Sequence, residues 1–355
     1  MRTEDTPRGR MRAAVLHAPR DLRLQEIPVP EPEADEVLVR ILANGICGSD
    51  LHFYEDGRLG PYRVSRPYVP GHEASGVVVR AARDGRGPSL GTRVALEPGI
   101  PCRRCPWCKS GRYNLCPDVV FLSAPPVDGT LSEYVALPAD FAHPVPEGVG
   151  DEEAAFVEPV AVAVQAAKRS GLTAGMSIAI LGCGPIGLLT LLVCRAYGAT
   201  SAYLFDRLPN RLELARSLGA TEAVDVSSRD ALRSVQELTR GRGVDVVFDT
   251  SGSASACRTA PLLAARGGVV TMVGYPESES IEYPVVTVIE RELDVRGVQR
   301  YANAYAPALA LLGSGRLEVK PLVSHRFAFA QVCEAFRFAS ENRSITMKVM
   351  VGGAG

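Results

Sequence analysis

A glycine-rich run between an apolar segment and a helix-length segment limits the fold of this chain more than any other feature. The run reads GCGPIG at residues 182–187, follows the apolar residues 178–181, and opens a mostly apolar segment that continues to residue 197 and stops at Gly198. Closely spaced glycines at such a place allow a tight turn from a parallel strand into a helix whose N-terminus stays open. The pattern predicts the first strand–turn–helix unit of a doubly wound α/β domain.

The residues that follow repeat this alternation. A helix is predicted at 211–218, stopped by Gly219, and the further candidate strands are 202–205, 223–226, 244–249, 269–273 and 293–298. Six strands joined by helical crossovers predict a parallel doubly wound sheet of the Rossmann type. Residues 161–299 are therefore interpreted as one domain.

The first part of the chain has a different character. It is rich in Pro and Gly and contains short β-type runs such as 36–42 and 76–79, which is typical of a β-rich domain with long loops. Residues 1–10 are expected to form a polar, disordered extension, and 11–160 the β-rich domain. The chain is expected to return to that domain over 300–355, with a helix near 330–339.

Composition excludes several classes of protein. The 355 residues are 46% hydrophobic and 22% charged with a net charge of −1, so a dedicated nucleic-acid binder is not expected. No apolar run has the length of a membrane span, and the N-terminus lacks the apolar core of a signal peptide. Nine cysteines, an odd and partly scattered set, indicate thiols in a reducing compartment, so a cytoplasmic location is expected.

Four of these cysteines are closely spaced. Cys102, Cys105, Cys108 and Cys116 read C-x2-C-x2-C-x7-C, and thiolates at this spacing can close on one tetrahedral zinc ion. Such a closed shell has a structural role, because it leaves no position for substrate. Two disulfides or an iron–sulfur cluster could use the same residues, but disulfides do not fit a reducing compartment. We favour structural zinc.

A second, open metal site can be assembled from distant segments. Cys47 lies in GICGSD, His72 and Glu73 in PGHEASG, and Glu158 in VEPVAV. Three protein ligands with a free fourth position are the usual arrangement of a catalytic zinc ion. Singly, each residue has an ordinary alternative: a lone cysteine is often a core residue, and Glu158 could cap a helix. Their joint occurrence with the thiolate set favours a catalytic centre.

The glycine run also predicts a dinucleotide site. Asp206 ends the second candidate strand, at the distance where an acidic residue meets the ribose hydroxyls of NAD. A carboxylate there repels the 2′-phosphate of NADP, so NAD is favoured. The neighbouring Arg207 moderates this preference.

Together these motifs resemble the zinc-dependent medium-chain dehydrogenases over essentially the whole folded length, and within them the polyol (sorbitol/L-iditol and xylitol) dehydrogenase group. The runs that carry the resemblance are GICGSDLHFYEDGRLG, PGHEASGVV, RVALEPG with the cysteine segment, FLSAPPVDGTLSEYV, VEPVAVAV, GCGPIGLL and GVQRYANAYAPAL. The resemblance implies a GroES-like β-rich catalytic domain plus a six-stranded Rossmann domain. It implies two zinc ions per subunit and hydride transfer from a polyol to NAD.

The resemblance also implies roles for individual residues. The catalytic zinc ligands would be Cys47, His72 and Glu73, with Glu158 either as a ligand or holding a water molecule on the zinc. The proton path would run through Ser49 and His52. The polyol would contact Tyr54, Phe121, Glu158, Arg300 and Tyr301. The coenzyme would contact Gly182, Gly184, Ile186, Gly187, Asp206, Arg211, Val273, Val298 and Arg300.

Several readings stay open at this point. The same chemistry could act on butane-2,3-diol, threonine or an aminocyclitol, because Ala124 and Gln165 depart from the residues of the polyol group. A non-catalytic NAD-binding protein and a zinc-free quinone reductase are disfavoured, since every metal-ligand position is filled. A homo-oligomer, tetramer or dimer, is expected by resemblance.

Overall fold

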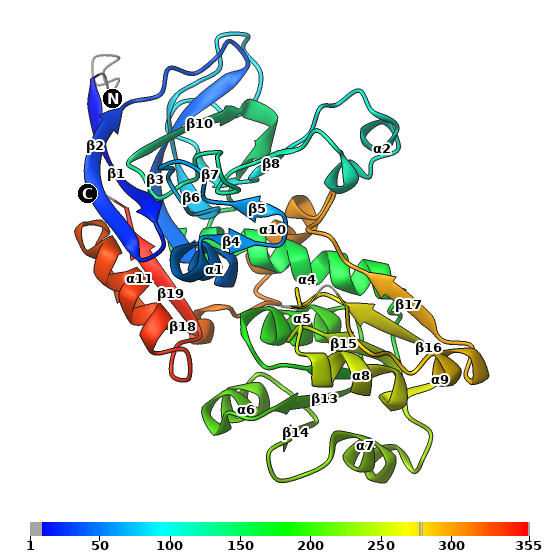
Figure 1. Ribbon diagram of the computed structural model, residues 1–355. Coiled ribbons are helices and arrows are strands. Elements are labelled where there is room, and N and C mark those ends of the chain that lie inside the picture. The colour runs from blue at the N-terminus through cyan, green and yellow to red at the C-terminus, as the bar shows by residue number, and fades with distance from the viewer. Residues whose placement is uncertain (1–8, 277, 279, 354–355) are drawn as a thin grey trace. The chain divides into compact units, whose positions relative to one another are not determined.

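The computed structural model describes residues 9–276, 278 and 280–353, and these form two compact units. The first unit runs to Glu158 and resumes at Leu322, and the second spans Pro159–Pro321 (Figure 1). The predicted extension at residues 1–10 lies almost wholly outside the described residues, and the first strand begins at Arg10.

The second unit is built on one parallel sheet of six strands. Its order is β14-β13-β12-β15-β16-β17 (Figure 1), which is the 3-2-1-4-5-6 order of a doubly wound fold. The strands are β12 (Ser177–Leu181), β13 (Ser201–Asp206), β14 (Glu222–Asp225), β15 (Val244–Asp249), β16 (Ala264–Met272) and β17 (Asp294–Gly297). The predicted fold class and all six predicted strands are confirmed.

Helices connect these strands. They are α4 (Val157–Ser170), α5 (Pro185–Ala196), α6 (Pro209–Ser217), α7 (Ala231–Thr239), α8 (Ala254–Leu263), α9 (Val285–Glu290) and α10 (Tyr305–Gly313). Side chains of α7 and α8 pack on one face of the sheet, in a cluster that includes Val235, Leu263 and Val247. The inner strands β12, β13 and β15 are mostly apolar and buried, as strands of a parallel sheet covered on both faces are. The edge strand β17 is largely exposed.

The first unit contains a mixed seven-stranded sheet of order β11-β7-β6-β3-β19-β18, with β10 also paired to β3. Its strands are β3 (Glu36–Ile46), β6 (Glu73–Arg80), β7 (Arg93–Leu96), β10 (Tyr134–Pro138), β11 (Ala142–Pro144), β18 (Val323–Phe327) and β19 (Lys348–Gly352). The smaller paired strands are β1 (Arg10–Ala18) with β2 (Asp21–Pro28), β4 (Arg58–Leu59) with β5 (Tyr62–Arg63), and β8 (Gly99–Ile100) with β9 (Val120–Phe121).

The C-terminal segment completes this first unit. The helices of the unit are α1 (Gly48–Asp56), α2 (Pro106–Lys109), α3 (Asp151–Ala155) and α11 (Val332–Glu341). Phe336 on α11 is fully buried and packs edge-on against Tyr54 of α1, with ring centroids 5.6 Å apart. The chain re-enters the first unit at Leu322. The sequence predicted this re-entry at residue 300, but α10 and its flanking residues belong to the compact second unit.

Within residues 9–276, 278 and 280–353, no helix is both long and apolar enough to cross a membrane.

Candidate active site and metal centres

The antiparallel pairing of β3 with β6 brings three predicted metal ligands together. Cys47 follows the last residue of β3, and His72 and Glu73 lie at the start of β6. The register pairs Gly45 with Glu73, so the end of one strand meets the start of the other. One ligand atom from each of Cys47, His72 and Glu73 lies within 4.8 Å of the other two. A thiolate, an imidazole and a carboxylate form a donor set suited to zinc, with a fourth position left for a small molecule.

A buried carboxylate supports this group from behind. Asp50 is fully buried and accepts hydrogen bonds from the backbone N–H of Cys47 at 3.0 Å, from that of Gly71 at 3.3 Å and from the Ser123 hydroxyl at 2.9 Å. Its Oδ1 also lies 3.4 Å from Nδ1 of His72. A carboxylate behind a ligating histidine fixes the ring orientation and raises its basicity. Asp50 lies in the run GICGSD, but no role was predicted for it from the sequence.

The protonation of His72 reflects these neighbours. Burial lowers the pKa of the imidazole, but the negative charges of Asp50 and Cys47 outweigh burial and raise that pKa well above its ordinary value. Metal ligands must be deprotonated, so the direction of this pKa shift makes metal binding at His72 compete with protons.

The other predicted residues near this centre fall into two groups. Phe121 on β9 packs against the His72 ring with centroids 5.6 Å apart, and Ser49 and His52 lie on one side of α1 at i,i+3 spacing. Tyr54 instead belongs to the apolar cluster around Phe336. That packing accounts for Tyr54 without a substrate contact, so its predicted contact stays a prediction.

Glu158 has a different position from the three clustered ligands. It lies in the first turn of α4 and is only 6% exposed. It is not a member of the group formed by Cys47, His72 and Glu73. The structure therefore brings together three of the four predicted ligands.

A buried lysine also contacts this centre and was missed from the sequence. The Lys348 ammonium donates to both oxygens of Glu73, at 2.7 and 2.6 Å. Burial lowers the pKa of Lys348, but the charges of Glu73 and Cys47 outweigh it and raise the pKa, so the lysine stays charged. A single lysine about 275 positions after its partner carries no sequence signal.

The four closely spaced cysteines form a second group. Cys102, Cys105, Cys108 and Cys116 also place one sulfur each within 4.8 Å of the others. The Cys105–Cys108 and Cys102–Cys108 sulfur separations are 3.3 and 4.0 Å. Zinc–sulfur bonds of about 2.3 Å in a tetrahedron would place sulfurs about 3.8 Å apart. All nine cysteines are free thiols, so the disulfide alternative is not realised.

Backbone amides stabilise the thiolates of this cysteine segment. The N–H groups of Cys102, Cys105 and Cys108 point at the sulfurs of Cys116, Cys102 and Cys105, at 3.3–3.4 Å. Hydrogen bonds from the backbone N–H groups of Arg104 and Cys105 lower the pKa of the Cys102 thiol to about 7. A thiol that loses its proton near neutral pH is ready to bind metal.

The cysteine segment is attached to the sheet through a buried carboxylate. Glu97 accepts a hydrogen bond from the Tyr113 hydroxyl at 2.7 Å and lies 2.7 Å from Nε2 of His143 on β11. Tyr113 lies between the third and fourth cysteines. The segment is thus held by a polar contact as well as by its own sulfur cluster.

The glycine turn follows β12, as predicted. Gly182 has a φ of +99°, and a Cβ on Gly187 would lie 1.9 Å from the Gly182 carbonyl oxygen. These two glycines are therefore required by the turn itself. At Gly184 the nearest atom to an added Cβ is Nη1 of Arg211 at 3.9 Å, so the backbone there is open to a ligand. Ile186 lies in the first turn of α5 beside it.

The predicted acidic residue lies at this turn. Asp206 accepts hydrogen bonds from the backbone N–H of Cys183 at 2.7 Å, and from those of Arg207 and Leu208 at 2.7 and 2.9 Å. The carboxylate therefore joins the end of β13 to the glycine turn, where the Arg211 guanidinium approaches Gly184. The turn glycines, Asp206 and Arg211 therefore form one group. This group can bind the pyrophosphate and the ribose of a dinucleotide.

The remaining predicted coenzyme and substrate residues belong to the second unit. Val273 and Val298 follow β16 and β17, at the same edge of the sheet as Gly182. Arg300 has a left-handed backbone with φ of 47° and a buried Nη1. Tyr301 is buried against Tyr305 with centroids 5.5 Å apart.

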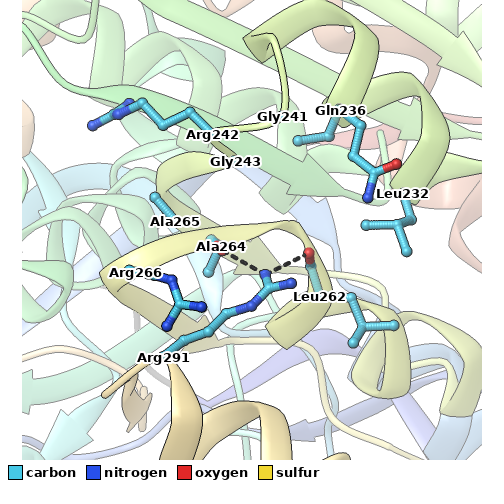
Figure 2. Close-up of a pocket in the computed structure, with 11 residues that line it drawn as sticks. Leu232, Gln236, Gly241, Arg242, Gly243, Leu262, Ala264, Ala265, Arg266 and Arg291 are labelled. Atoms are coloured by element: carbon cyan, nitrogen blue, oxygen red, sulfur yellow. Dashed lines mark hydrogen bonds between the residues drawn. The ribbon is translucent and has the colours of Figure 1, made fainter.

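A separate pocket of about 520 Å³ opens at the amino ends of β15 and β16, the edge opposite the glycine turn (Figure 2). The Arg291 guanidinium donates there to the carbonyls of Leu262 and Ala264, at 3.0 and 2.9 Å. None of the predicted site residues lines this pocket. Its lining is Leu232, Val235, Gln236, Gly241, Arg242, Gly243, Leu262, Ala264, Ala265, Arg266 and Arg291.

Comparisons with known proteins agree with the arrangement of both units. Residues 33–147 match the alcohol dehydrogenase GroES-like domain, and residues 185–314 match the zinc-binding dehydrogenase family. The chain is 41% identical to a sorbitol dehydrogenase of Bacillus subtilis, covering 96% of this chain and 97% of that protein. It is 39% identical to a probable D-xylulose reductase A of Arthroderma otae, covering 96% of each.

A solved structure has the same fold. An Escherichia coli oxidoreductase of unknown specificity superposes with a TM-score of 0.92 at 36% identity, covering 97% of this chain and 99% of that one. The ligand groups, the glycine turn and these matches lead to one conclusion: the chain belongs to the zinc-dependent medium-chain alcohol dehydrogenase family, in the group that contains the sorbitol dehydrogenases, and is an oxidoreductase.

Proposed function

We propose that this protein oxidises a secondary hydroxyl of a polyol, of the sorbitol, L-iditol or xylitol type, to the ketose while reducing NAD. The observation that carries the proposal is the convergence of Cys47, His72 and Glu73 in a chain that also has a dinucleotide-type glycine turn. The similarity to a sorbitol dehydrogenase over nearly the full length supports the choice of substrate class.

Cys47, His72 and Glu73 would hold the catalytic zinc ion. When bound, zinc supplies Lewis acidity that lowers the pKa of an alcohol. Asp50, 3.4 Å from Nδ1 of His72, would orient the imidazole ring. Ser49 would accept the proton of the substrate hydroxyl and pass it to His52, whose side chain is 35% exposed and can release it to water.

The second unit would bind NAD, and its Arg300 would contact the polyol. The backbone at Gly184 leaves room for the pyrophosphate, and Asp206 would accept from the ribose hydroxyls. Arg300 and Glu158 would bind the additional hydroxyls of the polyol. A site that hydrogen-bonds a substrate hydroxyl discriminates strongly against analogues that lack it.

Two further properties belong to this proposal. Val285, Val286 and Ile289 of α9 are each more than half exposed, next to the edge strand β17. An exposed apolar group beside a free strand edge favours association, so a homo-oligomer is proposed. Nine free thiols support a cytoplasmic location.

The first prediction concerns two zinc ions per subunit, one exchangeable and one tightly held. Cys47→Ser should lower turnover at least ~100-fold with little change in melting temperature, because it removes a ligand of the open site. Cys105→Ser should mainly lower the melting temperature, because it opens the closed thiolate shell. Metal analysis, melting curves and turnover test this, with Cys333→Ser as the control. If Cys47→Ser and Cys105→Ser changed turnover and melting temperature in the same way, the division into a catalytic and a structural zinc site would be contradicted.

The second prediction concerns coenzyme choice. The wild-type enzyme should prefer NAD, and Asp206→Asn and Asp206→Ala should reduce the NAD/NADP ratio of kcat/KM at least ~10-fold, since the negative charge that repels the 2′-phosphate is lost. Asp225→Ala is the matched control, because Asp225 is the register partner of Asp206 on the next strand. A wild-type preference for NADP would refute the prediction.

The third prediction tests the function itself. With NAD, a panel of sorbitol, xylitol, L-iditol, butane-2,3-diol, threonine and a simple secondary alcohol should give the highest kcat/KM for a polyol. Arg300→Ala should cost about 2 kcal/mol, or ~30-fold in kcat/KM, with the polyol, because a charge-assisted hydrogen bond is lost. The loss with the simple alcohol should be much smaller. Equal losses would assign Arg300 a bracing role and weaken the polyol assignment.

The fourth prediction concerns assembly. In light scattering after size exclusion, the wild type should elute as a dimer or tetramer, and Val286→Asp with Ile289→Asp should shift it to a smaller species. Ile345→Asp is the control, because Ile345 is similarly exposed but lies in the first unit. A monomeric wild type would contradict the proposed oligomer.

A further inference from the structure

The pocket at the amino ends of β15 and β16 has no part in the proposed function. It lies wholly within the second unit and is lined by residues of α7, of the loop after α7, of α8 and of β16, and by Arg291 after α9 (Figure 2). Its volume of about 520 Å³ is that of a small-molecule site. Because the glycine turn lies at the opposite edge of the sheet, a ligand here would be distinct from the coenzyme.

Three arginines give this pocket an excess of positive charge. Arg242 is paired with Asp245. Among the residues that the structure describes, no carboxylate forms an ion pair with Arg266 or Arg291, and the lining itself contains no acidic residue. Two guanidinium charges therefore face the pocket without an anionic partner.

Backbone contacts hold these two arginines on neighbouring segments. Nη1 of Arg266 donates to the carbonyl of Glu290 at 2.8 Å, and the N–H of Gly267 donates to the carbonyl of Arg291 at 2.7 Å. Figure 2 shows both arginine side chains on the same wall of the pocket. Like charges repel each other, so an anion that both guanidinium groups contact would stabilise this wall.

Both guanidinium groups keep N–H donors for a ligand. Nη1 of Arg291 donates to the carbonyls of Leu262 and Ala264, at 3.0 and 2.9 Å, and thereby offsets the partial negative charge at the C-terminal end of α8. In the described part of the chain, Nη2 and Nε of Arg291 and of Arg266 have no further hydrogen-bond acceptor. A guanidinium group presents its donors as a planar fork, which suits the oxygens of a phosphate or a carboxylate.

The floor of the pocket is apolar and already formed. Val235 and Ala264 are buried in the core cluster of the second unit, and Leu232 packs against that cluster. Gly243 holds the loop after α7 close to α8, because a Cβ there would lie 2.8 Å from the carbonyl oxygen of Leu263. A ligand that fills this space needs an apolar body as well as an anionic group.

We propose that this pocket binds a small phosphate monoester. The phosphate would lie between Arg266 and Arg291, and the apolar or ring-containing body of the ester would lie against Leu232 and Val235. A phosphate monoester carries roughly −1.5 to −2 charges at neutral pH, which matches two unpaired guanidinium groups better than the single charge of a carboxylate does. The site is separate from the metal groups and from the glycine turn.

The experiment measures binding to the full-length protein by calorimetry, with and without saturating NAD. Phenyl phosphate, inorganic phosphate and benzoate separate the effect of the phosphate from that of the apolar body. The variants are Arg266→Gln, which removes a cation, and Gln236→Glu, which adds a carboxylate to the lining. Arg258→Gln is the matched control, because Arg258 is an exposed arginine of α8 that does not line the pocket. Melting temperatures and turnover without added ligand verify that each variant is folded.

Phenyl phosphate should bind to one site per chain, at least ~10-fold more tightly than inorganic phosphate or benzoate, because only this probe has both the dianionic group and the apolar body. Its affinity should be the same with and without NAD. Arg266→Gln and Gln236→Glu should each weaken its binding at least ~10-fold, whereas Arg258→Gln should not change it.

Three results would overturn the proposal. Tighter binding of benzoate would assign the pocket to carboxylates, and equal binding of phenyl phosphate and inorganic phosphate would remove the role of the apolar floor. Absence of binding, displacement of phenyl phosphate by NAD, or wild-type affinity in both Arg266→Gln and Gln236→Glu would show that the pocket is not the site. None of these results bears on NAD-dependent turnover, so the proposed function is tested separately.

Discussion

The register between β3 and β6 is the constraint on which the metal centre depends. It places Gly45 opposite Glu73 and brings Cys47 next to His72. Because side chains alternate across a strand, a slip of one residue would turn Glu73 to the other face and bring Ala74 in its place. The buried side chains of β3, such as Val37 and Val39, hold this register through the core. Packing far from the site thus determines which ligands meet.

The two metal groups are organised on different principles. All four thiolates of the closed group lie within residues 102–116, so their geometry follows from local turns and from amides that point at sulfur. The open group depends on long-range strand pairing and on Asp50, which joins the Cys47, Gly71 and Ser123 segments. A local group can form on its own with metal, whereas the open group requires a folded sheet. The closed group is therefore suited to a structural role, and the open group to a catalytic role.

Much of this arrangement could be predicted from the sequence. The strand periodicity and GCGPIG predicted the parallel sheet, and the cysteine spacing predicted the closed group, because both signals are local. Strand β16 begins at Ala264, five residues before the predicted start at 269, because Ala264 pairs with Val244 across an irregular register that propensity does not reveal. Lys348 and Gly45 could not be predicted, since their meaning depends on a sheet that joins residues about 300 positions apart. Tyr54 was chosen by resemblance, and its packing against Phe336 is a tertiary effect.

The discontinuous first unit has a consequence for how the protein is made. Strand β19, which pairs with β3 and carries Lys348, follows the second unit in the sequence, whereas β3 and β6 precede it. During synthesis on the ribosome the second unit is therefore complete in one continuous stretch before β19 is made. Glu73 acquires its ammonium partner only after that, so the open metal group matures later than the parallel sheet.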